Sequence, residues 1–362
     1  SSRLRLIATT IQLILVASAK SSQLSLLPPA PMKFGFIPTE GGAHYPEFLE
    51  EVMLGESLGF DSVWLEEHHG VRDHYWPSPL VALAGVATRT TNIILGTDIA
   101  VLPFYHPVRI AEDAALLDIM SGGRLILGVA IGYKPDEFDL YQVPLKMRGA
   151  RFEEAIRLIK LLWTQKEVHF KGKYYQVEGL KIEPRPLSKP HPPIWIGGWG
   201  ELSLARAAQL ADAWVPGPTA NWEKLVQTWE TYQRNMESAG RDFSRQPTPL
   251  TREVVVAETD ELARDMAERH LLINYRDEYG GGKWKHPLIG GEDSAPVDEF
   301  EAISRDRFLV GSPERITAEL QRYKEAFQVD HLICRLFFPG MPHEFILDEL
   351  RLLADRVMPA FK

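Results

Sequence analysis

Cysteine and basic residues are the scarce components of this chain of 362 residues. The one cysteine, Cys334, excludes an intrachain disulfide and any zinc site built on several thiolates, and it is typical of a reducing compartment. Lysine and arginine together number 40 against 49 aspartates and glutamates, so the net charge is −9. Because no basic surplus exists to neutralise phosphates, we expect no nucleic-acid partner. We expect a cytoplasmic protein.

A continuous apolar run long enough to span a membrane is also missing. The apolar run Leu6–Ala17 is too short and too interrupted by polar residues for a transmembrane helix. Basic residues before it and the small residues at its end give it the layout of a secretory signal. Met32, however, begins a strand-like segment at a natural start. We therefore interpret 1–31 as an upstream or expression-derived extension outside the fold, with an export signal as the alternative, and 32–362 as a single domain.

From Met32 onward, strand-like and helix-like segments alternate. The clearest unit is 106–132, in which an amphipathic helix stops at two glycines and an apolar strand follows. The expected strands are Lys33–Pro38, Asp61–Glu66, Asn92–Leu102, 124–131, Ile194–Gly197, Ala213–Val215, Leu250–Ala257 and His331–Phe337. The expected helices are Tyr45–Leu58, 79–88, 107–121, Arg148–Thr164, Leu202–Ala211, Asn221–Ala239, Asp260–Leu271, Pro313–Phe327 and His343–Met358.

About eight βα units without a break in composition predict an α/β fold of the (β/α)8 TIM-barrel type. A doubly wound sheet is the alternative, but Pro38–Gly42 lacks the glycine spacing that such a sheet has after its first strand. Two insertions interrupt the alternation. Residues 165–193, before strand five, contain an expected hairpin over Val168–Val177 and a proline-rich run. Residues 272–311 follow strand seven.

Barrel enzymes build their active sites from residues at the carboxyl ends of the strands. Glu66-Glu67-His68-His69 places titratable groups directly after an apolar strand, and His68 is the candidate acid–base residue. The alternative is a capped, partly solvated turn. A metal site that includes His74 is a weaker alternative, because neighbouring strand residues point to opposite faces. We expect no metal.

Two further strand ends suit a flat, phosphorylated cofactor. Gly96-Thr97-Asp98-Ile99 offers small residues beneath an aromatic ring, although Asp98 taken alone is better explained by a hydrogen bond at a strand end. Ile196-Gly197-Gly198-Trp199-Gly200 leads into a helix, as a phosphate-binding turn does, although a tight turn also needs glycine. Arg148 and Arg151 begin a helix and are candidates to contact a phosphate or a ring carbonyl.

Taken together, these segments resemble the bacterial luciferase-like flavin-dependent monooxygenases. The resemblance rests on DSVWLEEHH at 61–69, LGTDIAVLP at 95–103, the unit 106–132, PPIWIGGWG at 192–200 and VGSPERITAEL at 310–320. It implies a (β/α)8 barrel, often dimeric, that binds reduced FMN or the related deazaflavin coenzyme.

The resemblance also implies residue roles. His68 takes the place of the essential histidine, and the insertion 272–311 takes the place of a mobile lid, with a plain surface loop as the alternative. The segment 97–99 is where the family often has a non-proline cis bond beneath the flavin ring. The implied cofactor-binding residues are Thr97, Asp98, Ile99, Arg148, Arg151, Ile196, Gly197, Gly198, Trp199 and Gly200.

The chain departs from the light-emitting luciferases in two places. Ala130 and Ile131 stand where those enzymes have a reactive cysteine and a phosphate-binding arginine, and a glycine-rich turn replaces their serine-rich one. Bioluminescence is therefore not expected. We predict a homodimeric monooxygenase that uses reduced FMN and O2 on a small organic substrate, with a flavin reductase as supplier of reduced FMN. The alternatives are a deazaflavin-dependent hydride-transfer oxidoreductase and a flavin-binding protein without turnover.

Overall fold

The structure is a computed structural model that describes residues 31–71, 75–277, 288–289 and 299–362. The extension expected over 1–31 therefore lies outside the described residues except for Pro31, as do His74 and two parts of the insertion 272–311.

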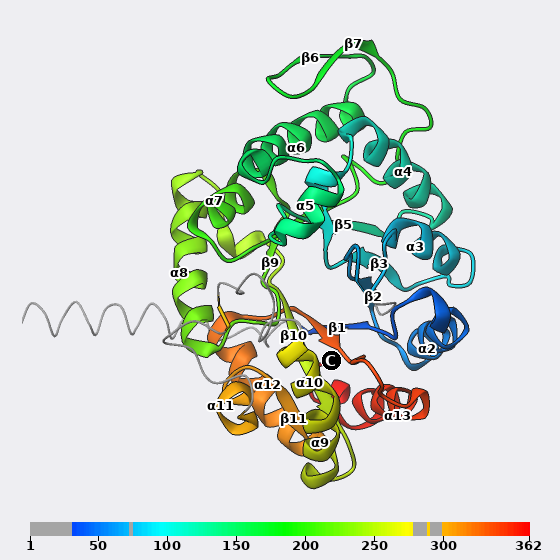
Figure 1. The fold of residues 1–362 in the computed structure, drawn as a ribbon, viewed down its shortest axis with the longest axis vertical. Helices are drawn as coiled ribbons and strands as arrows, with labels where there is room; N and C mark the ends of the chain where they lie inside the picture. The colour runs from blue at the N-terminus through cyan, green and yellow to red at the C-terminus, as the bar shows by residue number, and fades with distance from the viewer. Residues whose placement is uncertain (1–30, 72–74, 278–287, 290–298) are drawn as a thin grey trace, which may run out of the picture. The chain divides into compact units, whose positions relative to one another are not determined.

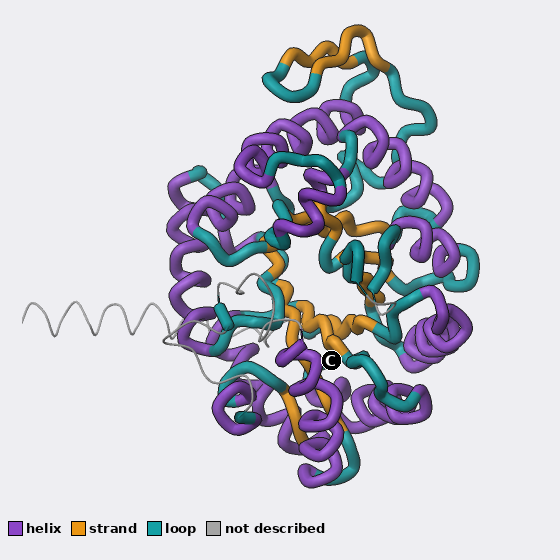
Figure 2. Tube along the Cα trace, in the orientation of Figure 1, coloured by secondary structure: helices purple, strands orange, loops and turns teal. Residues whose placement is uncertain are grey.

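Within the described residues, the centre of the fold is a curled parallel sheet with helices around its outside (Figures 1 and 2). Nine strands follow one another in the order β11-β10-β12-β1-β2-β3-β5-β8-β9, and the short β4 pairs with β5. Their bounds are β1 Lys33–Ile37, β2 Ser62–Leu65, β3 Ile94–Thr97, β4 Ala100–Val101, β5 Leu125–Ala130, β8 Ile194–Gly197, β9 Ala213–Val215, β10 Pro249–Val256, β11 Leu309–Gly311 and β12 His331–Arg335. The α/β class expected from the sequence is confirmed.

The two ends of this sheet approach each other through the backbone. Thr251 N, in β10, donates a hydrogen bond of 3.1 Å to Pro216 O, directly after β9. The strands are buried on both faces because helices cover the outside and side chains fill the inside. Every residue of β2, β8 and β9 is accordingly buried.

Most of the helices that surround the sheet lie where the periodicity predicts them. Pro107 at the start of α4 and left-handed Gly59 after α2 act as the expected start and stop signals. The bounds are α2 Tyr45–Leu58, α3 Pro79–Ala87, α4 Pro107–Met120, α5 Pro135–Leu140, α6 Arg148–Thr164, α7 Glu201–Leu210, α8 Trp222–Ser238, α9 Asp260–Met266, α10 Leu272–Tyr275, α11 Phe300–Ser304, α12 Pro313–Phe327 and α13 His343–Leu352.

Several elements differ from the expected ones. The strand expected over Asn92–Leu102 is divided into β3 and β4 by the cis peptide bond Asp98–Ile99. The sequence analysis also missed α5, a single short helix after β5, and β11, which pairs with β10 inside the expected insertion. Short elements such as these carry too few residues for a periodic pattern. The helix expected to end at Leu271 continues to Tyr275 through a π-helical turn.

The hairpin expected before strand five consists of β6, Val168–Lys171, and β7, Gln176–Leu180. It extends three residues beyond the expected end at Val177 and lies beyond α6 in Figure 1. Glu154 of α6 holds the hairpin turn, because its carboxylate accepts the backbone N–H groups of Tyr174 at 2.9 Å and Tyr175 at 2.6 Å. The hairpin therefore reaches back toward the first turns of α6.

The inside of the curled sheet is filled by large apolar side chains. The indole rings of Trp64 and Trp195 stack with 4.9 Å between their centroids. Below them, Trp64 Nε1 donates to Ser62 Oγ at 2.7 Å, and Ser62 Oγ lies 2.6 Å from His331 Nε2. The Ser62 hydroxyl accepts from the indole and can donate its own proton to Nε2 when His331 is neutral. Burial lowers the pKa of His331 to about 3, and the charge of Lys33 acts in the same direction.

No helix of the described residues combines the length and the apolar character that crossing a membrane requires.

We predict that burial of His331 makes the stability of the fold sensitive to acid. Unfolded, the imidazole takes up a proton below pH 6.5, whereas the native state with a pKa of about 3 does not, so stability falls as pH falls. Between pH 6 and pH 4 this one group removes about 2.5 kcal/mol of unfolding free energy. We expect the pH dependence of His331→Gln to be weaker by that amount in urea unfolding. Parallel pH curves for the two proteins would contradict the assignment.

Candidate active site

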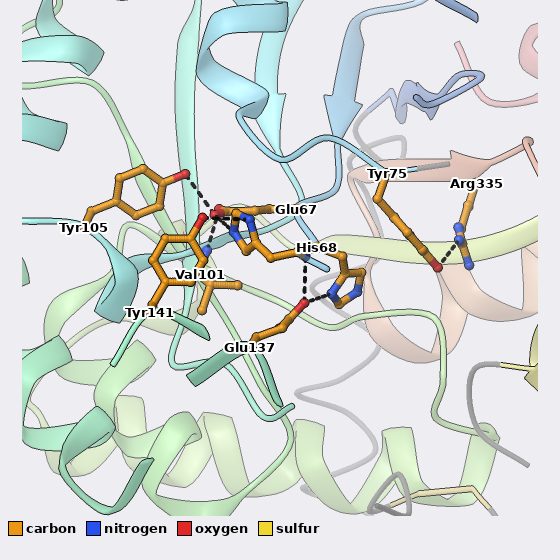
Figure 3. Close-up of polar contacts among 9 residues, drawn as sticks. Glu67, His68, Tyr75, Val101, Tyr105, Glu137, Tyr141 and Arg335 are labelled. Carbon is orange, nitrogen blue, oxygen red and sulfur yellow. Dashed lines mark hydrogen bonds and ion pairs between the residues drawn. The ribbon is translucent and has the colours of Figure 1, made fainter. Parts of the chain in front are cut away.

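The carboxyl end of β2 carries a histidine–carboxylate pair. His68 Nδ1 lies 2.8 Å from Glu137 Oε1, and the same oxygen accepts the backbone N–H of His69 at 3.0 Å (Figure 3). The side chain of His68 is 14% exposed and that of Glu137 is 4% exposed. Burial opposes ionisation of Glu137, but the hydrogen bond and charge of His68, the His69 amide and the charge of Lys134 outweigh it and lower its pKa.

Glu137 therefore orients the imidazole. A carboxylate can only accept, so Nδ1 carries a proton and Nε2 is the nitrogen left for other partners. No hydrogen bond among the described residues uses His68 Nε2, which makes this atom the one that can exchange a proton with a ligand.

The neighbouring residues Glu67 and His69 form a separate, buried network. Glu67 Oε1 lies 2.6 Å from His69 Nε2 and accepts Tyr105 OH at 2.9 Å, while Oε2 accepts Val101 N at 2.9 Å (Figure 3). Tyr141 OH lies 2.9 Å from His69 Nδ1. With both ring nitrogens of His69 engaged, the network fixes the end of β2 and leaves His68 as the histidine of this pair that can serve a ligand.

Aromatic rings surround His68. The ring of Tyr75 stands edge-on at 4.6 Å between centroids and that of Tyr133 at 6.2 Å. The hydroxyl of Tyr75 accepts a hydrogen bond from Arg335 Nη2 at 3.2 Å (Figure 3). Arg335, at the end of β12, thus connects the surroundings of His68 with the inside of the sheet.

Four charged residues form what we call the polar layer: Glu66, Asp98, Glu253 and Arg335. Each comes two residues after a residue that faces the inside of the sheet, so alternation turns all four side chains inward near the carboxyl ends. Arg335 Nε lies 2.8 Å from Glu66 Oε2, and Arg335 Nη1 lies 3.8 Å from Glu253 Oε1. Burial raises the pKa of Glu253, although the charge of Arg335 opposes the shift.

The structure brings two of the predicted cofactor-binding segments together. An added Cβ at Gly197 would lie 2.7 Å from Ile99 Cδ1, so the break after β3 contacts the end of β8. Thr97 Oγ1 donates to Gly128 O at 2.7 Å and is buried. Asp98 is partly exposed and accepts from Thr251 Oγ1 at 2.5 Å.

The turn after β8 has the backbone of an open anion cradle. Gly198 has a φ of +126°, and a Cβ there would lie 2.9 Å from Ser203 Cβ, so only glycine fits without strain. Gly200 precedes α7 and has no heavy atom within 4 Å of an added Cβ. Ile196 is buried, and Trp199 packs edge-on against Trp214 at 5.8 Å. Free N–H groups at this helix start suit a phosphate.

The two predicted arginines lie at the start of α6. Arg148 Nη1 donates to Leu145 O at 2.9 Å. The guanidinium of Arg151 lies over the rings of Tyr175 at 5.2 Å and Tyr174 at 5.8 Å, on the hairpin. The Nε atoms of Arg148 and Arg151 are both buried without a hydrogen-bond partner.

The start of α6 also lies beside α7, because a Cβ at Gly149 would lie 2.6 Å from Arg206 Nη2. Arg148 is therefore brought near the helix that follows the glycine turn, whereas Arg151 faces the hairpin.

Sequence reasoning missed Glu137, Tyr75 and the role of Arg335. The sequence does carry a signal for Arg335, because a charged residue two positions after Ile333 continues the inward face of a buried strand. Glu137 lies in the short helix α5 that the sequence analysis did not predict. Of the described residues, no three His, Cys, Asp or Glu side chains are grouped as a metal ion requires, and His74 lies outside this range.

The curled α/β fold thus brings a histidine–carboxylate pair, a glycine turn and a polar layer together near the carboxyl ends of its strands, where barrel enzymes have their active sites. The chain belongs to the luciferase-like monooxygenase family, whose sequence model matches residues 30–329. This is a family of flavin-dependent monooxygenases and oxidoreductases.

Individual relatives cover most of the chain. The oxygenase component of a flavin-dependent trigonelline monooxygenase from Acinetobacter baylyi is 28% identical over 88% of this chain and 90% of its own length. An F420-dependent glucose-6-phosphate dehydrogenase from Amycolatopsis mediterranei is 27% identical over 87% of this chain and 94% of its own. The crystal structure of the monooxygenase RslO1 from Streptomyces bottropensis superposes with a TM-score of 0.80 at 26% identity, covering 91% of this chain and 100% of the other.

We predict that a side chain at Gly198 weakens cofactor binding. A valine at this position collides with Ser203 and blocks backbone approach, so Gly198→Val should weaken FMN binding by at least about 1.4 kcal/mol, a tenfold change in Kd by fluorescence quenching. The matched control is Gly217→Ala, because its Cβ would meet only Trp199 Nε1 at 3.8 Å. Unchanged affinity in a folded Gly198→Val protein would remove the turn from the phosphate site.

Proposed function

We propose that this protein is a monooxygenase that uses reduced FMN and O2 to oxygenate a small organic substrate. The observation that carries the proposal is the His68–Glu137 pair at the end of β2, in a chain of the luciferase-like family. The relative from Acinetobacter baylyi, an oxygenase component, supports oxygenation and a separate flavin reductase as the supplier of reduced FMN.

The residues present fit a flavin mononucleotide. The space beside Gly200 is open. The buried Nε–H groups of Arg148 and Arg151 are donors without an acceptor, and a phosphate or a ring carbonyl of the cofactor would supply one. In this proposal the glycine turn Ile196–Gly200 holds the phosphate, and Thr97, Asp98 and Ile99 lie beneath the ring.

Bound reduced FMN would supply the electrons that activate O2. The protein would hold the ring, and the aromatic side chains of Tyr75 and Tyr133 would limit access of water near His68. His68 would donate or accept a proton at Nε2, since Glu137 engages Nδ1.

The second candidate is hydride transfer through the deazaflavin coenzyme F420. It is favoured by the 27% identical F420-dependent relative and by the glycine turn, which lacks the luciferase serines. Anaerobic titration with reduced FMN and with reduced F420, followed by O2 and assay for an oxygenated product, separates the two. Binding of either cofactor without product formation from any substrate would favour the flavin-binding protein without turnover.

Further parts of the proposal concern the assembly. We propose that β1, β2, β3, β5, β8, β9, β10 and β12 close into a (β/α)8 barrel, which the bond from Thr251 to Pro216 supports. We propose a homodimer through α3 and α4. Leu116, Ile119 and Met120 share one face of α4 and are exposed, and Val81 on the adjacent α3 is 70% exposed. The cytoplasmic location and the lid role of 272–311 stay predictions.

We predict that removing the imidazole of His68 lowers turnover and leaves flavin binding nearly unchanged. His68→Ala should reduce coupled oxygenation on the order of 10²-fold or more, because a positioned acid–base group contributes that much. Its FMN affinity should stay within about threefold, and release of hydrogen peroxide should rise. The control is His169→Ala, an exposed histidine on the hairpin. Full activity of His68→Ala would exclude the role, and a proportional loss of FMN binding would make His68 a cofactor ligand.

The apolar face of α4 predicts a dissociable dimer. Leu116→Glu places a charge in that face and should convert a dimer to a monomer in analytical ultracentrifugation. Leu262→Glu on α9 is the control, since Leu262 is exposed on a different helix. A wild-type protein that sediments as a monomer at all concentrations would contradict the proposal.

A further inference from the structure

A hydrogen bond of Asp98 spans the inside of the curled sheet. Asp98 follows β3, yet its Oδ2 accepts the hydroxyl of Thr251 in β10 at 2.5 Å. Along the sheet, three strands (β2, β1 and β12) separate β3 from β10. A side chain that joins two strands so far apart in the sheet lies across the interior rather than along its wall.

An apolar floor lies below this carboxyl. Gly96, two residues before Asp98, packs on Trp64, since a Cβ at Gly96 would lie 2.1 Å from that indole. Asp98 therefore lies one level nearer the carboxyl ends than Trp64. The floor consists of Ile37, Trp64, Ile126, Trp195, Ala213, Val215 and Ile333, with Ile94 and Ile99 against it. Asp98 itself is partly exposed, whereas Thr97 is buried.

The charged groups that face Asp98 leave it without a close counterion. Glu66 faces it from the end of β2, Glu253 from β10 and Arg335 from β12. Arg335 is engaged by Glu66 at 2.8 Å and lies 3.8 Å from Glu253. Among the described residues, no cation lies within ion-pair distance of Asp98. Burial raises the pKa of Asp98 to about 7, and the charge of Glu66 adds to the shift, while the Thr251 hydrogen bond and Arg335 oppose it.

We propose that Asp98 is a second acid–base residue of this site, which donates a proton from Oδ1 to the ligand bound in the mouth of the sheet. The proposal rests on the proposed function, because the bound ligand is the flavin with its substrate. Since Oδ2 accepts from Thr251, Oδ1 is the oxygen that carries the proton.

The proton balance of the step is simple. The Oδ1–H bond breaks, its electron pair stays on the carboxylate, and the proton passes to a basic atom of the ligand. Thr251 Oγ1 and the charge of Arg335 stabilise the carboxylate that results, and solvent returns the proton. His68 and Asp98 follow different strands, β2 and β3, and have different partners, Glu137 and Thr251, so the two proton-transfer groups of the proposal are independent of each other.

The first test is made on the protein without cofactor. Difference infrared spectroscopy measures the carbonyl stretch of protonated carboxyl groups as pH is changed, and Asp98→Asn should lose one such group that titrates near pH 7. The control is Asp113→Asn, an exposed aspartate of α4 with 44% of its side chain exposed, which should leave that titration unchanged. An unaltered titration in Asp98→Asn overturns the proposal whether or not the protein uses a flavin.

The second test is the pH dependence of turnover. An acid must be protonated to act, so the wild-type rate should fall as pH rises past about 7. Assayed with FMN at saturation, Asp98→Asn should turn over about 10²-fold more slowly or worse and lack this alkaline decline. A retained decline, or loss of FMN binding in proportion to activity, overturns the acid–base role while leaving the proposed function standing.

Thr251 supplies an independent pair of variants that leave Asp98 in place. Thr251→Val removes the hydrogen bond that favours the carboxylate, so both the infrared titration and the alkaline decline should move to higher pH. Thr251→Ser keeps the hydroxyl and should leave both where they are. Identical titrations in Thr251→Val and Thr251→Ser overturn the proposal even if Asp98→Asn does not fold.

Discussion

The stacked indoles of Trp64 and Trp195 are the packing constraint on which the active site depends. Their rings lie 4.9 Å apart inside the sheet, and both are almost wholly buried. They fit only because Gly35 and Gly96 have no side chain, since a Cβ at Gly35 would lie 2.7 Å from Trp64 Nε1. This plug fills the interior, so the inward side chains of Glu66, Asp98, Glu253 and Arg335 lie between it and the carboxyl ends of the strands.

Above the plug, several acidic residues hold particular partners, because burial makes an unpaired charge costly. Glu67 holds His69 and the backbone of Val101, and Glu137 holds His68. Glu66 engages Arg335. Of these four residues, Asp98 alone has no charged side chain or histidine among its described hydrogen-bond partners, and it is bonded to the hydroxyl group of Thr251. The contacts therefore engage both histidines at the end of β2, whereas burial raises the pKa of Asp98, which lacks such a partner, to about 7.

The family resemblance read from the sequence is correct, and so is the placement of most helices and strands. Amphipathic periods in segments such as 107–121 depend on neighbours a few residues apart, so they are visible in the sequence. The segment 97–99 carries the cis bond at Asp98–Ile99 and contacts Gly197, as a common cofactor site would require. The short elements α5 and β11 were missed because their form depends on what they pack against.

By itself, the sequence determined the alternation of helices and strands, the family, and the strand ends at which His68 and the glycine turn lie. The tertiary structure decided which charged groups meet. His68 and Glu137 are 69 residues apart in the chain, and Asp98 and Thr251 are 153 apart. The physical reason is that local pattern records which face of a strand a residue occupies, whereas the curl of the sheet decides what stands opposite that face. For that reason Arg335 and Asp98 acquire their partners, and Asp98 its raised pKa, only in the folded chain.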